Sequence, residues 1–256
     1  MLRSFSFYGY DVSMFSMAIS FALFSIVIYS ISMISRRKHY KSGDEAKYIT
    51  AIPLGLLCGC VTAYASDVFF RGEIRDLLTI PPKYGFTFMG WLIGCMVYFR
   101  IHSWICRISY LELLNLYLPV FALAQAIGRI GCFCGGCCYG KPVKWGVIYP
   151  AGSYPDQCYH GVALHPVQLY ESVYLFIVFI LLLKAVPFPY RAGVYLISIS
   201  CGRFFFEYFR GDPRGDIFRN SPFSPAQLLA ISLFVFGVLL VYYQNRRQKN
   251  NLGDFY

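Results

Sequence analysis

The sequence is poor in charged residues. Only 14% of its 256 residues are Asp, Glu, Lys or Arg, whereas soluble domains carry about 25%. Acidic residues are the scarcer kind, with 13 Asp and Glu and 23 Lys and Arg. Hydrophobic residues make up 57% of the chain and aromatic residues 19%. This composition argues against a soluble globular domain and indicates a protein whose main solvent is lipid.

Several other features are missing from the sequence. The first residues carry a single base, Arg3, and no pair of small residues marks a cleavage site after the first apolar run, so we expect no cleaved signal peptide. No internal repeat, low-complexity tract or linker is visible. We therefore expect the first apolar run to cross the membrane and residues 1–256 to form one integral membrane domain.

Apolar runs long enough to cross a bilayer recur along the chain. A transmembrane helix needs about 20 mostly apolar residues, and seven such runs are separated by charges or by Pro and Gly. The pattern predicts an all-α, polytopic transmembrane helical bundle with about seven spans. The predicted spans are 14–34, 49–70, 86–98, 111–127, 169–185, 193–208 and 226–243.

The basic residues predict an orientation. The net charge of +10 is compatible with nucleic-acid binding, but the bases lie in short loops between the spans, where topogenic charge is expected. We therefore expect no nucleic-acid partner. One side collects bases with almost no acid, namely Arg36, Arg37, Lys38, Lys41, Lys47, Arg100, Arg107, Lys184, Arg191, Arg246, Arg247 and Lys249. The positive-inside rule makes that side cytoplasmic, which places the N-terminus outside, the C-terminus inside and the longest loop, 128–167, on the outer side.

Three groups of polar residues interrupt the apolar pattern near the predicted outer side. Arg129 follows the fourth span, between glycines that let a headgroup approach. Arg203, Glu207 and Arg210 are spaced by four and three residues and are expected on one face of the sixth span. Ionisable residues at membrane depth are costly and are rare without a partner or a function. The excess of arginine over glutamate predicts an anionic ligand.

The third group begins the fifth predicted span. His165 and Pro166 mark a helix start, since proline suits a first turn. Gln168 and Glu171, one turn apart, then point the same way, with Tyr170 between them. Arginine binds phosphate oxygens through two parallel hydrogen bonds. Convergent arginines near a membrane surface therefore suggest a clamp for a lipid phosphate, which would also stabilise charge on a phosphate leaving group.

At these residues the chain resembles the prolipoprotein diacylglyceryl transferases of bacterial inner membranes. The resemblance covers most of the chain. Residues 128–141 are similar to the family signature of Gly, Arg, Ile, Gly, Asn, Phe, any residue, Asn, Gly and Glu, followed by an aromatic residue, Gly and a base. The His-Pro-x-Gln-Leu-Tyr-Glu element stands intact at 165–171. The late Arg and Glu element appears as Arg203, Glu207 and Arg210, and Gln227 begins the last span as in the family.

The resemblance implies an enzyme that moves the diacylglyceryl group of phosphatidylglycerol onto the lipobox cysteine thiol of prolipoproteins. Its partners would be phosphatidylglycerol, membrane lipid and prolipoprotein signal peptides, and it would need no cofactor. By position, Arg129 and Arg203 would be catalytic. The residues implied to bind substrate are Arg129, Gly140, His165, Gln168, Tyr170, Glu171, Glu207 and Arg210.

The chain departs from the family pattern at several polar positions. Met89 stands where the family usually has a histidine, and Phe15 where it has a tyrosine. Two asparagines and the glutamate of the signature are replaced by Cys132, Gly135 and Cys137. The arginines remain, while the residue that accepts the thiol proton is unassigned. An alternative is therefore a catalytically altered relative that binds anionic phospholipid.

Ten cysteines form the least usual feature. Disulfides in the outer loop, with Cys158 as one partner, are one interpretation. A soft metal is another, although the spacing lacks two separated pairs and adjacent Cys137 and Cys138 are not expected to bind one ion together. A third is a thiol role in catalysis for Cys132 or Cys137. An outward-facing thiol redox or metal protein is thus a further alternative function, and we expect structural cysteines and no metal.

Overall fold

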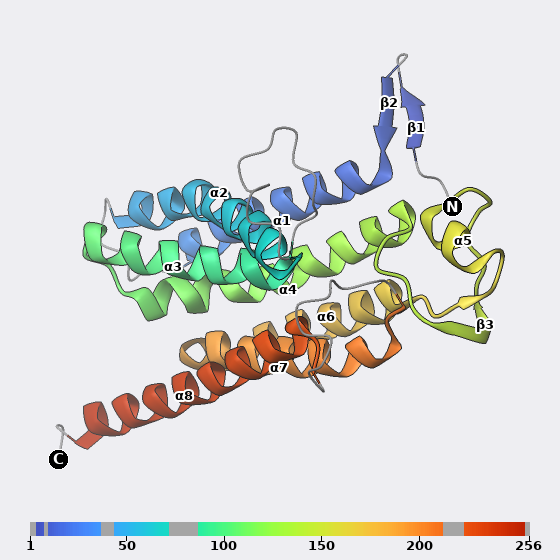
Figure 1. The fold of residues 1–256 in the computed structure, drawn as a ribbon. Coiled ribbons are helices and arrows are strands. Elements are labelled where there is room, and N and C mark those ends of the chain that lie inside the picture. The colour runs from blue at the N-terminus through green and yellow to red at the C-terminus, as the bar shows by residue number, and fades with distance from the viewer. Residues whose placement is uncertain (1–3, 8–9, 37–43, 72–86, 212–222, 254–256) are drawn as a thin grey trace.

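Long helices that lie side by side make up most of the structure (Figure 1). The structure is a computed structural model, and it describes residues 4–7, 10–36, 44–71, 87–211 and 223–253. The elements in chain order are β1 Ser4–Phe7, β2 Tyr10–Ser13, α1 Met14–Arg36, α2 Asp44–Arg71, α3 Phe88–Cys106, α4 Tyr110–Gly135, β3 Pro142–Val147, α5 Tyr154–Tyr159, α6 Val167–Lys184, α7 Arg191–Phe206 and α8 Pro225–Gly253. Short 3-10 turns occupy Phe188–Tyr190 and Glu207–Phe209. Strands β1 and β2 pair as an antiparallel hairpin.

The predicted all-α membrane bundle is confirmed. Every predicted span coincides with a helix, and five described helices are long and apolar enough to cross a membrane: α1, α2, α4, α6 and α8. The two remaining helices that coincide with predicted spans are α3, with 19 residues, and α7, with 16 residues. The outer surfaces of the helices expose large apolar side chains such as Phe24, Leu57 and Leu239, which indicates contact with lipid. The count of seven spans stays a prediction.

Helix α4 is the central helix. In its most apolar stretch 67% of the residues are buried, compared with 22% to 44% in the other four candidate spans. It packs against α1, α6 and α7, and its run of buried residues includes Leu113, Tyr117 and Phe121. Because α4 is surrounded by protein, it can carry polar side chains that a lipid-facing helix would not tolerate.

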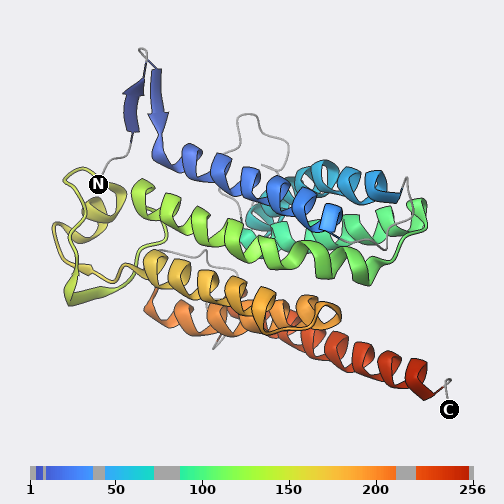
Figure 2. The same cartoon turned by 180° about the vertical axis from the view of Figure 1, so that it is seen from behind.

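The helices alternate in direction, so each end of the bundle is formed by the starts of some helices and the ends of others. At one end the start of α2 meets the end of α3 and the start of α4, because His102 Nε2 lies 2.7 Å from the Lys47 carbonyl oxygen and Tyr117 donates to the Tyr48 carbonyl at 2.6 Å. At the other end lie the end of α4, the start of α6 and the end of α7, beside β3 and α5 (Figures 1 and 2). The two ends differ strongly in their polar chemistry.

The prediction that a loop begins after residue 127 is wrong. Helix α4 continues through Gly128 and Arg129 to Gly135, since packing against α1, α6 and α7 outweighs the low helix propensity of glycine. It ends where Gly136 takes a φ of 73°, a left-handed conformation that favours glycine. The remaining outer segment contains β3 and α5. The predicted start of the third span at Phe86, and the bases Arg37, Lys38 and Lys41, lie outside the described residues.

The segment after the cysteines is hydrogen-bonded on both sides. Gly140 N donates to the His165 carbonyl at 3.0 Å, and Lys141 N donates to the Phe209 carbonyl at 2.9 Å. Gly140 and Arg210 form an isolated antiparallel bridge. This segment therefore joins the start of α6 to the chain that follows α7, and it fixes the ends of three helices relative to one another.

Candidate functional site

A single carboxylate, Glu171, is the centre of a buried ionic cluster at this end of the bundle. It lies in the first turns of α6 and faces three arginines from different parts of the chain. Arg129 Nε of α4 contacts Oε2, while Arg203 Nη1 of α7 and Arg210 Nη1 lie 3.4 Å and 3.6 Å from Oε1. The sequence predicted polar groups at this end of the bundle, and the structure brings them into direct contact.

A second carboxylate extends this cluster toward α8. Arg203 Nη2 lies 2.9 Å from Glu207 Oε2, as the spacing of four residues predicted. Ser224 Oγ donates to Glu207 Oε1 at 3.0 Å, and the backbone N–H of Gln227 donates to Ser224 Oγ at 3.2 Å. The residues around Gln227 therefore position Glu207 from the start of the last helix.

The prediction that Arg210 lies on the helical face of Arg203 is wrong. Helix α7 ends at Phe206, a 3-10 turn covers Glu207–Phe209, and Arg210 is extended with φ −75° and ψ 140°. Its bridge with Gly140 fixes this extended conformation. Arg210 still reaches Glu171, because the chain turns back at the end of α7.

The cluster is buried and consists, among the described residues, of three arginines and two glutamates. The exposed fractions are only 9% for Arg129, 9% for Arg203, 7% for Arg210 and 4% for Glu171. Taking charges out of water is costly unless they are paired, and three guanidinium groups that converge on one place can also bind an anionic ligand. The arrangement suits a phosphate diester, because each guanidinium can share its remaining donors with phosphate oxygens.

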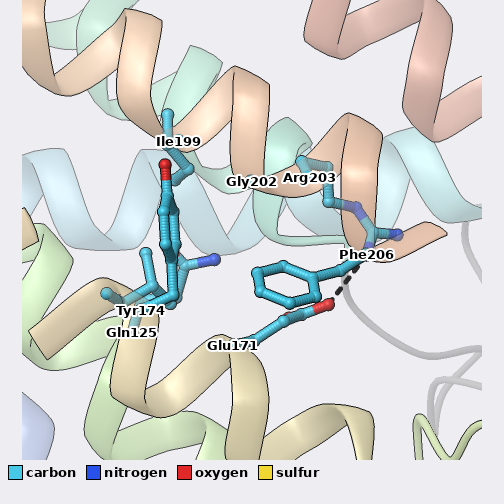
Figure 3. Close-up of a pocket in the computed structure, with 8 residues that line it drawn as sticks. Gln125, Glu171, Tyr174, Ile199, Gly202, Arg203 and Phe206 are labelled. Carbon is cyan, nitrogen blue, oxygen red and sulfur yellow. Dashed lines mark hydrogen bonds and ion pairs between the residues drawn. The ribbon is translucent and has the colours of Figure 1, made fainter. Parts of the chain in front are cut away.

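A small, partly open pocket with a cavity volume of about 10 Å³ lies beside the cluster, between α4, α6 and α7. Figure 3 shows Arg203 and Glu171 at one side of this pocket and Gln125 with Tyr174 at the other. Apolar residues such as Leu175 and Phe206 complete its walls. Gln125 is 9% exposed, and its Oε1 atom has no hydrogen-bond partner among the residues that the structure describes. This oxygen can accept a hydrogen bond from a hydroxyl group of a ligand.

Gln168 points inward from α6, as predicted, but contacts the outer segment instead of the arginines. Its Nε2 donates to the Cys137 carbonyl at 2.7 Å, and the Tyr149 hydroxyl donates to its Oε1 at 3.2 Å. Tyr149 is buried, and this burial raises the pKa of its hydroxyl to about 12. Gln168 therefore holds the cysteine turn and the outer segment against the start of α6.

The remaining predicted substrate-binding residues lie next to the ionic cluster. His165 packs among the rings of Trp145, Tyr170 and Phe209, and its Nδ1 is 3.4 Å from the Tyr170 hydroxyl. Gly140 passes so close to His165 that an added Cβ would come within 2.7 Å of the His165 carbonyl oxygen. A side chain at Gly140 would push the arginine-bearing segment away from α6. A direct role of these residues in substrate binding stays a prediction.

The cysteines do not form disulfides in this structure. All ten are free. Cys158, suggested above as a disulfide partner, lies beside the Tyr139 hydroxyl. Cys132, Cys137 and Cys138 instead place their Sγ atoms within 4.8 Å of one another. The thiols of adjacent Cys137 and Cys138 thus lie close together, while the expectation that they do not bind one ion together stays a prediction.

Backbone geometry explains why these three thiols meet. The Cys137 N–H donates to the Cys132 carbonyl at 3.1 Å, which folds the chain back over the last turn of α4. Cys138 then takes a φ of 61°, a left-handed conformation that is uncommon outside glycine. Hydrogen bonds from the Cys132 and Cys137 thiols, with the charges of Arg210 and Arg129, hold the pKa of Cys138 well below its usual range. The same thiol contacts raise the pKa of Cys137.

The two other positions that depart from the family pattern differ in their surroundings. Met89 is 4% exposed, within the hydrophobic core. Phe15 is 40% exposed, at the start of α1, and packs near the end of α4. Neither side chain can accept a proton, so neither supplies the base that these positions would provide in the family.

Sequence reasoning missed three polar residues of this region. Gln125 stands four residues before Arg129, a spacing that places both on one face of a helix. Tyr149 gave no signal, since its contact with Gln168 depends on how the outer segment folds. Cys138 was counted among the cysteines, but its convergence with Cys132 depends on two left-handed residues.

Comparison with known proteins gives one consistent result. The family model described as prolipoprotein diacylglyceryl transferase matches residues 3–243. The chain is 29% identical over 229 residues to the phosphatidylglycerol–prolipoprotein diacylglyceryl transferase of Clostridium tetani, covering 83% of this chain and 88% of that protein. It is 28% identical to that of Clostridioides difficile, with 98% of each chain covered. The enzyme of Chlamydia caviae is 35% identical over 69% of this chain and 63% of its own length. With a match over nearly its whole length and its arginines and glutamates gathered at one site, the chain belongs to the prolipoprotein diacylglyceryl transferase family.

Proposed function

We propose that this protein transfers the diacylglyceryl group of phosphatidylglycerol to a cysteine thiol of prolipoproteins. The observation that carries the proposal is the convergence of Arg129, Arg203 and Arg210 in one buried cluster beside a small pocket. The relatives are named for phosphatidylglycerol and prolipoprotein. The oxygens of a phosphate diester can accept hydrogen bonds from several guanidinium groups at once.

The chemistry of the donor explains why arginine is needed. When a thiolate attacks the glyceryl carbon, the carbon–oxygen bond to phosphate breaks and negative charge grows on the departing glycerol phosphate. Guanidinium groups placed around that phosphate stabilise the charge as it develops. Glu171 holds Arg129 and Arg203 in place before the substrate arrives, so little reorganisation is needed during the reaction.

The pocket suits the polar end of the donor. Its arginine side would receive the phosphate, and Gln125 would accept a hydrogen bond from a hydroxyl of the glycerol headgroup, because its buried Oε1 has no partner. The apolar walls around Leu175 and Phe206 would contact the glyceryl ester region. Buried polar groups that pair with one headgroup discriminate against lipids lacking it.

The proposed location is the bacterial inner membrane, with the site near the outer leaflet. The bases that predict the cytoplasmic side lie at helix ends opposite the ionic cluster, for example Arg36 at the end of α1, Lys184 at the end of α6 and Arg191 at the start of α7. The positive-inside rule then places the C-terminus in the cytoplasm and the N-terminus outside.

The test is transfer in vitro by the purified full-length protein. It would be given phosphatidylglycerol vesicles and a lipobox peptide, and thioether product would be measured by mass spectrometry. The Arg129→Lys and Arg203→Lys variants should each lose at least about 100-fold in rate, because an ammonium cannot replace the planar fork. Arg246→Lys, at an exposed position of α8, is the matched control and should keep wild-type activity. Full activity in the first two variants would overturn the assignment.

A second candidate function is phospholipid binding without transfer. Met89 and Phe15 favour it, because both replace polar residues of the family pattern. Complementation of a conditional transferase mutant separates the two. Growth with matured lipoproteins supports the transferase, whereas retained phosphatidylglycerol binding without rescue supports the binding protein.

A further inference from the structure

The thiol cluster at the end of α4 has features of a metal site. The Sγ atoms of Cys132, Cys137 and Cys138 lie within 4.8 Å of one another. Zn²⁺ binds cysteine sulfur at about 2.3 Å, so sulfurs of a tetrahedral site are about 3.8 Å apart. Movements of about 1 Å by the side chains would bring the three sulfurs to that spacing. Three protein ligands leave one tetrahedral position open, as in catalytic zinc sites.

The backbone around the cluster holds this convergence in place. Gly136 and Cys138 have φ of 73° and 61°, and Cys138 adopts this conformation although it is not glycine. Non-glycine residues in the left-handed region are over-represented at functional sites. Gln168 fixes the turn through the Cys137 carbonyl at 2.7 Å. The cluster is thus a formed feature of the fold.

The cluster is also close to the proposed donor site. Cys132 follows Arg129 by three residues on α4, so the two lie on the same face of the helix. The Cys138 thiol is near enough to Arg210 and Arg129 to interact with their charges. Cys137 is exposed, while Cys132 and Cys138 are half-buried, so an ion in the cluster would be reachable from outside.

We propose that Cys132, Cys137 and Cys138 bind a Zn²⁺ ion through three thiolates, and that the open fourth position binds the acceptor cysteine as its thiolate. The second half rests on the proposed transferase function. It addresses the missing proton acceptor, because a thiol that coordinates zinc is deprotonated outright. The position of the family's histidine holds Met89, which cannot take that proton.

The step balances as follows. The acceptor S–H bond breaks, the sulfur binds zinc and the proton passes to water. The zinc-bound sulfur then attacks the glyceryl carbon with its electron pair, and the carbon–oxygen bond to phosphate breaks, leaving that pair on the glycerol phosphate held by the arginines. The thioether formed is a weaker zinc ligand than a thiolate and leaves the metal. No oxidant or reductant is needed.

Metal binding can be tested without any assay of transfer. Purified full-length protein in detergent, reduced and stripped with chelator, would be titrated with Zn²⁺ and separately with Co²⁺. We expect one ion per chain, protection of three thiols from alkylation by zinc, and thiolate-to-cobalt charge-transfer absorption with the visible bands of tetrahedral coordination. Cys132→Ser, Cys137→Ser and Cys138→Ser should each weaken binding by more than about 100-fold, since second-shell changes alone cost about 10- to 100-fold. Thermal unfolding of the metal-free variants should match that of the metal-free wild type.

Neighbouring cysteines provide matched controls. Cys134 lies on the same turn of α4, and Cys158 lies in α5, yet neither belongs to the cluster. Cys134→Ser and Cys158→Ser should bind Zn²⁺ like the wild type. Absence of stoichiometric binding, equal losses in the control variants, or a disulfide within the cluster that forms in preference to the metal complex would overturn the proposal.

The acceptor position has its own test. A lipobox peptide should change the spectrum of the Co²⁺ form, whereas the same peptide with serine in place of cysteine should not. Transfer by the metal-free protein should fall at least about tenfold and return with Zn²⁺. Unchanged transfer after removal of the metal would overturn this proposal and leave the transferase function standing. If no form of the protein transfers lipid, the proposed function fails, and metal titration still decides whether the site exists.

Discussion

Arginine is used in opposite ways at the two ends of the bundle. At the cytoplasmic-facing end proposed above, Arg191 donates to the carbonyls of Leu183 and Val186 at 3.0 Å and 3.2 Å and completes the end of α6. Arg246 is exposed and donates to the Tyr242 hydroxyl. At the other end Arg129 and Arg203 are buried and face Glu171. The same residue type closes helices at one end and forms an ionic network at the other.

This difference shows which arginines are candidates for function. An exposed arginine near a helix end stabilises weakly and sets topology. A buried arginine is costly unless it is paired, and a carboxylate that pairs with arginines of several segments also fixes those segments relative to one another. Glu171 on α6 meets this requirement, because its partners come from α4, from α7 and from the chain after α7.

The largest expected effect comes from removing the central carboxylate. In Glu171→Gln three arginines lose a shared negative partner, so we expect transfer to be lost and the free energy of unfolding to fall by about 3–5 kcal/mol. Glu112→Gln is the control at the opposite end, where the Tyr48 hydroxyl donates to Oε2 at 2.8 Å. An amide oxygen can still accept that bond, so the loss should be below about 1 kcal/mol. Equal losses in denaturant unfolding would remove the distinction between the two ends.

A second comparison uses two buried glutamines. Oε1 of Gln125, in the proposed lipid pocket, and Oε1 of Gln244, at the far end of α8, both lack a hydrogen-bond partner. Gln125→Leu should lower kcat/KM for phosphatidylglycerol about tenfold, with no loss of stability. This factor corresponds to a loss of about 1.4 kcal/mol of transition-state stabilisation, the size of one hydrogen bond. Gln244→Leu should leave kcat/KM unchanged. Vesicle assays that show the same kinetics for both variants would contradict the assignment of Gln125 to the headgroup.

A smaller effect is expected at the start of α8. Ser224→Ala removes the hydrogen bond to Glu207 and the one from Gln227 N. The free energy of unfolding should fall by about 1 kcal/mol and transfer by about fivefold. Ser232→Ala, about two turns further along the chain and exposed, should behave like the wild type. A Ser224→Ala variant with wild-type activity would show that Glu207 needs no support from α8.

The smallest effect at neutral pH is expected for Tyr149→Phe. Burial raises the pKa of Tyr149 to about 12, compared with about 10 in an unfolded chain. The neutral hydroxyl therefore adds stability below pH 10 that is lost as the pH rises from about 10 to 12. Tyr149→Phe should flatten this alkaline loss in thermal unfolding, and Tyr190→Phe, at the opposite end, should retain it. An unchanged alkaline profile in Tyr149→Phe would contradict the assignment.

The sequence predicted the helices well because apolar runs report lipid contact directly. It also predicted the Arg203–Glu207 pair, since both residues lie four apart on one helix. Glu171 was assigned to the same site only as a neighbour, because contacts between helices leave no periodic signal. The position of Arg210 past the end of α7 depends on its bridge with Gly140, more than 60 residues earlier.

The end of α4 was the least predictable part. The end of the apolar run at Ile127 predicted a loop from Gly128 onward, but burial against other helices kept the segment helical. The convergence of Cys132, Cys137 and Cys138 depends on left-handed φ angles at two residues. Glycine at 136 is compatible with such an angle, whereas nothing in the sequence indicates it at Cys138. Backbone conformation set by tertiary contacts is the information that a single sequence lacks.

The pairing pattern around Glu171 has a consequence for how the chain enters the membrane during synthesis. Arg129 and Glu171 belong to α4 and α6 and can neutralise each other before α7 has been made. Helix α7 then brings Arg203 with its own partner Glu207 at its end. Each inserting unit is thus close to neutral, which lowers the cost of placing ionisable side chains in lipid. Arg210, the last of the three arginines, joins Glu171 only after α7 has ended, so the anion-binding property is completed only when the helices around it are in place.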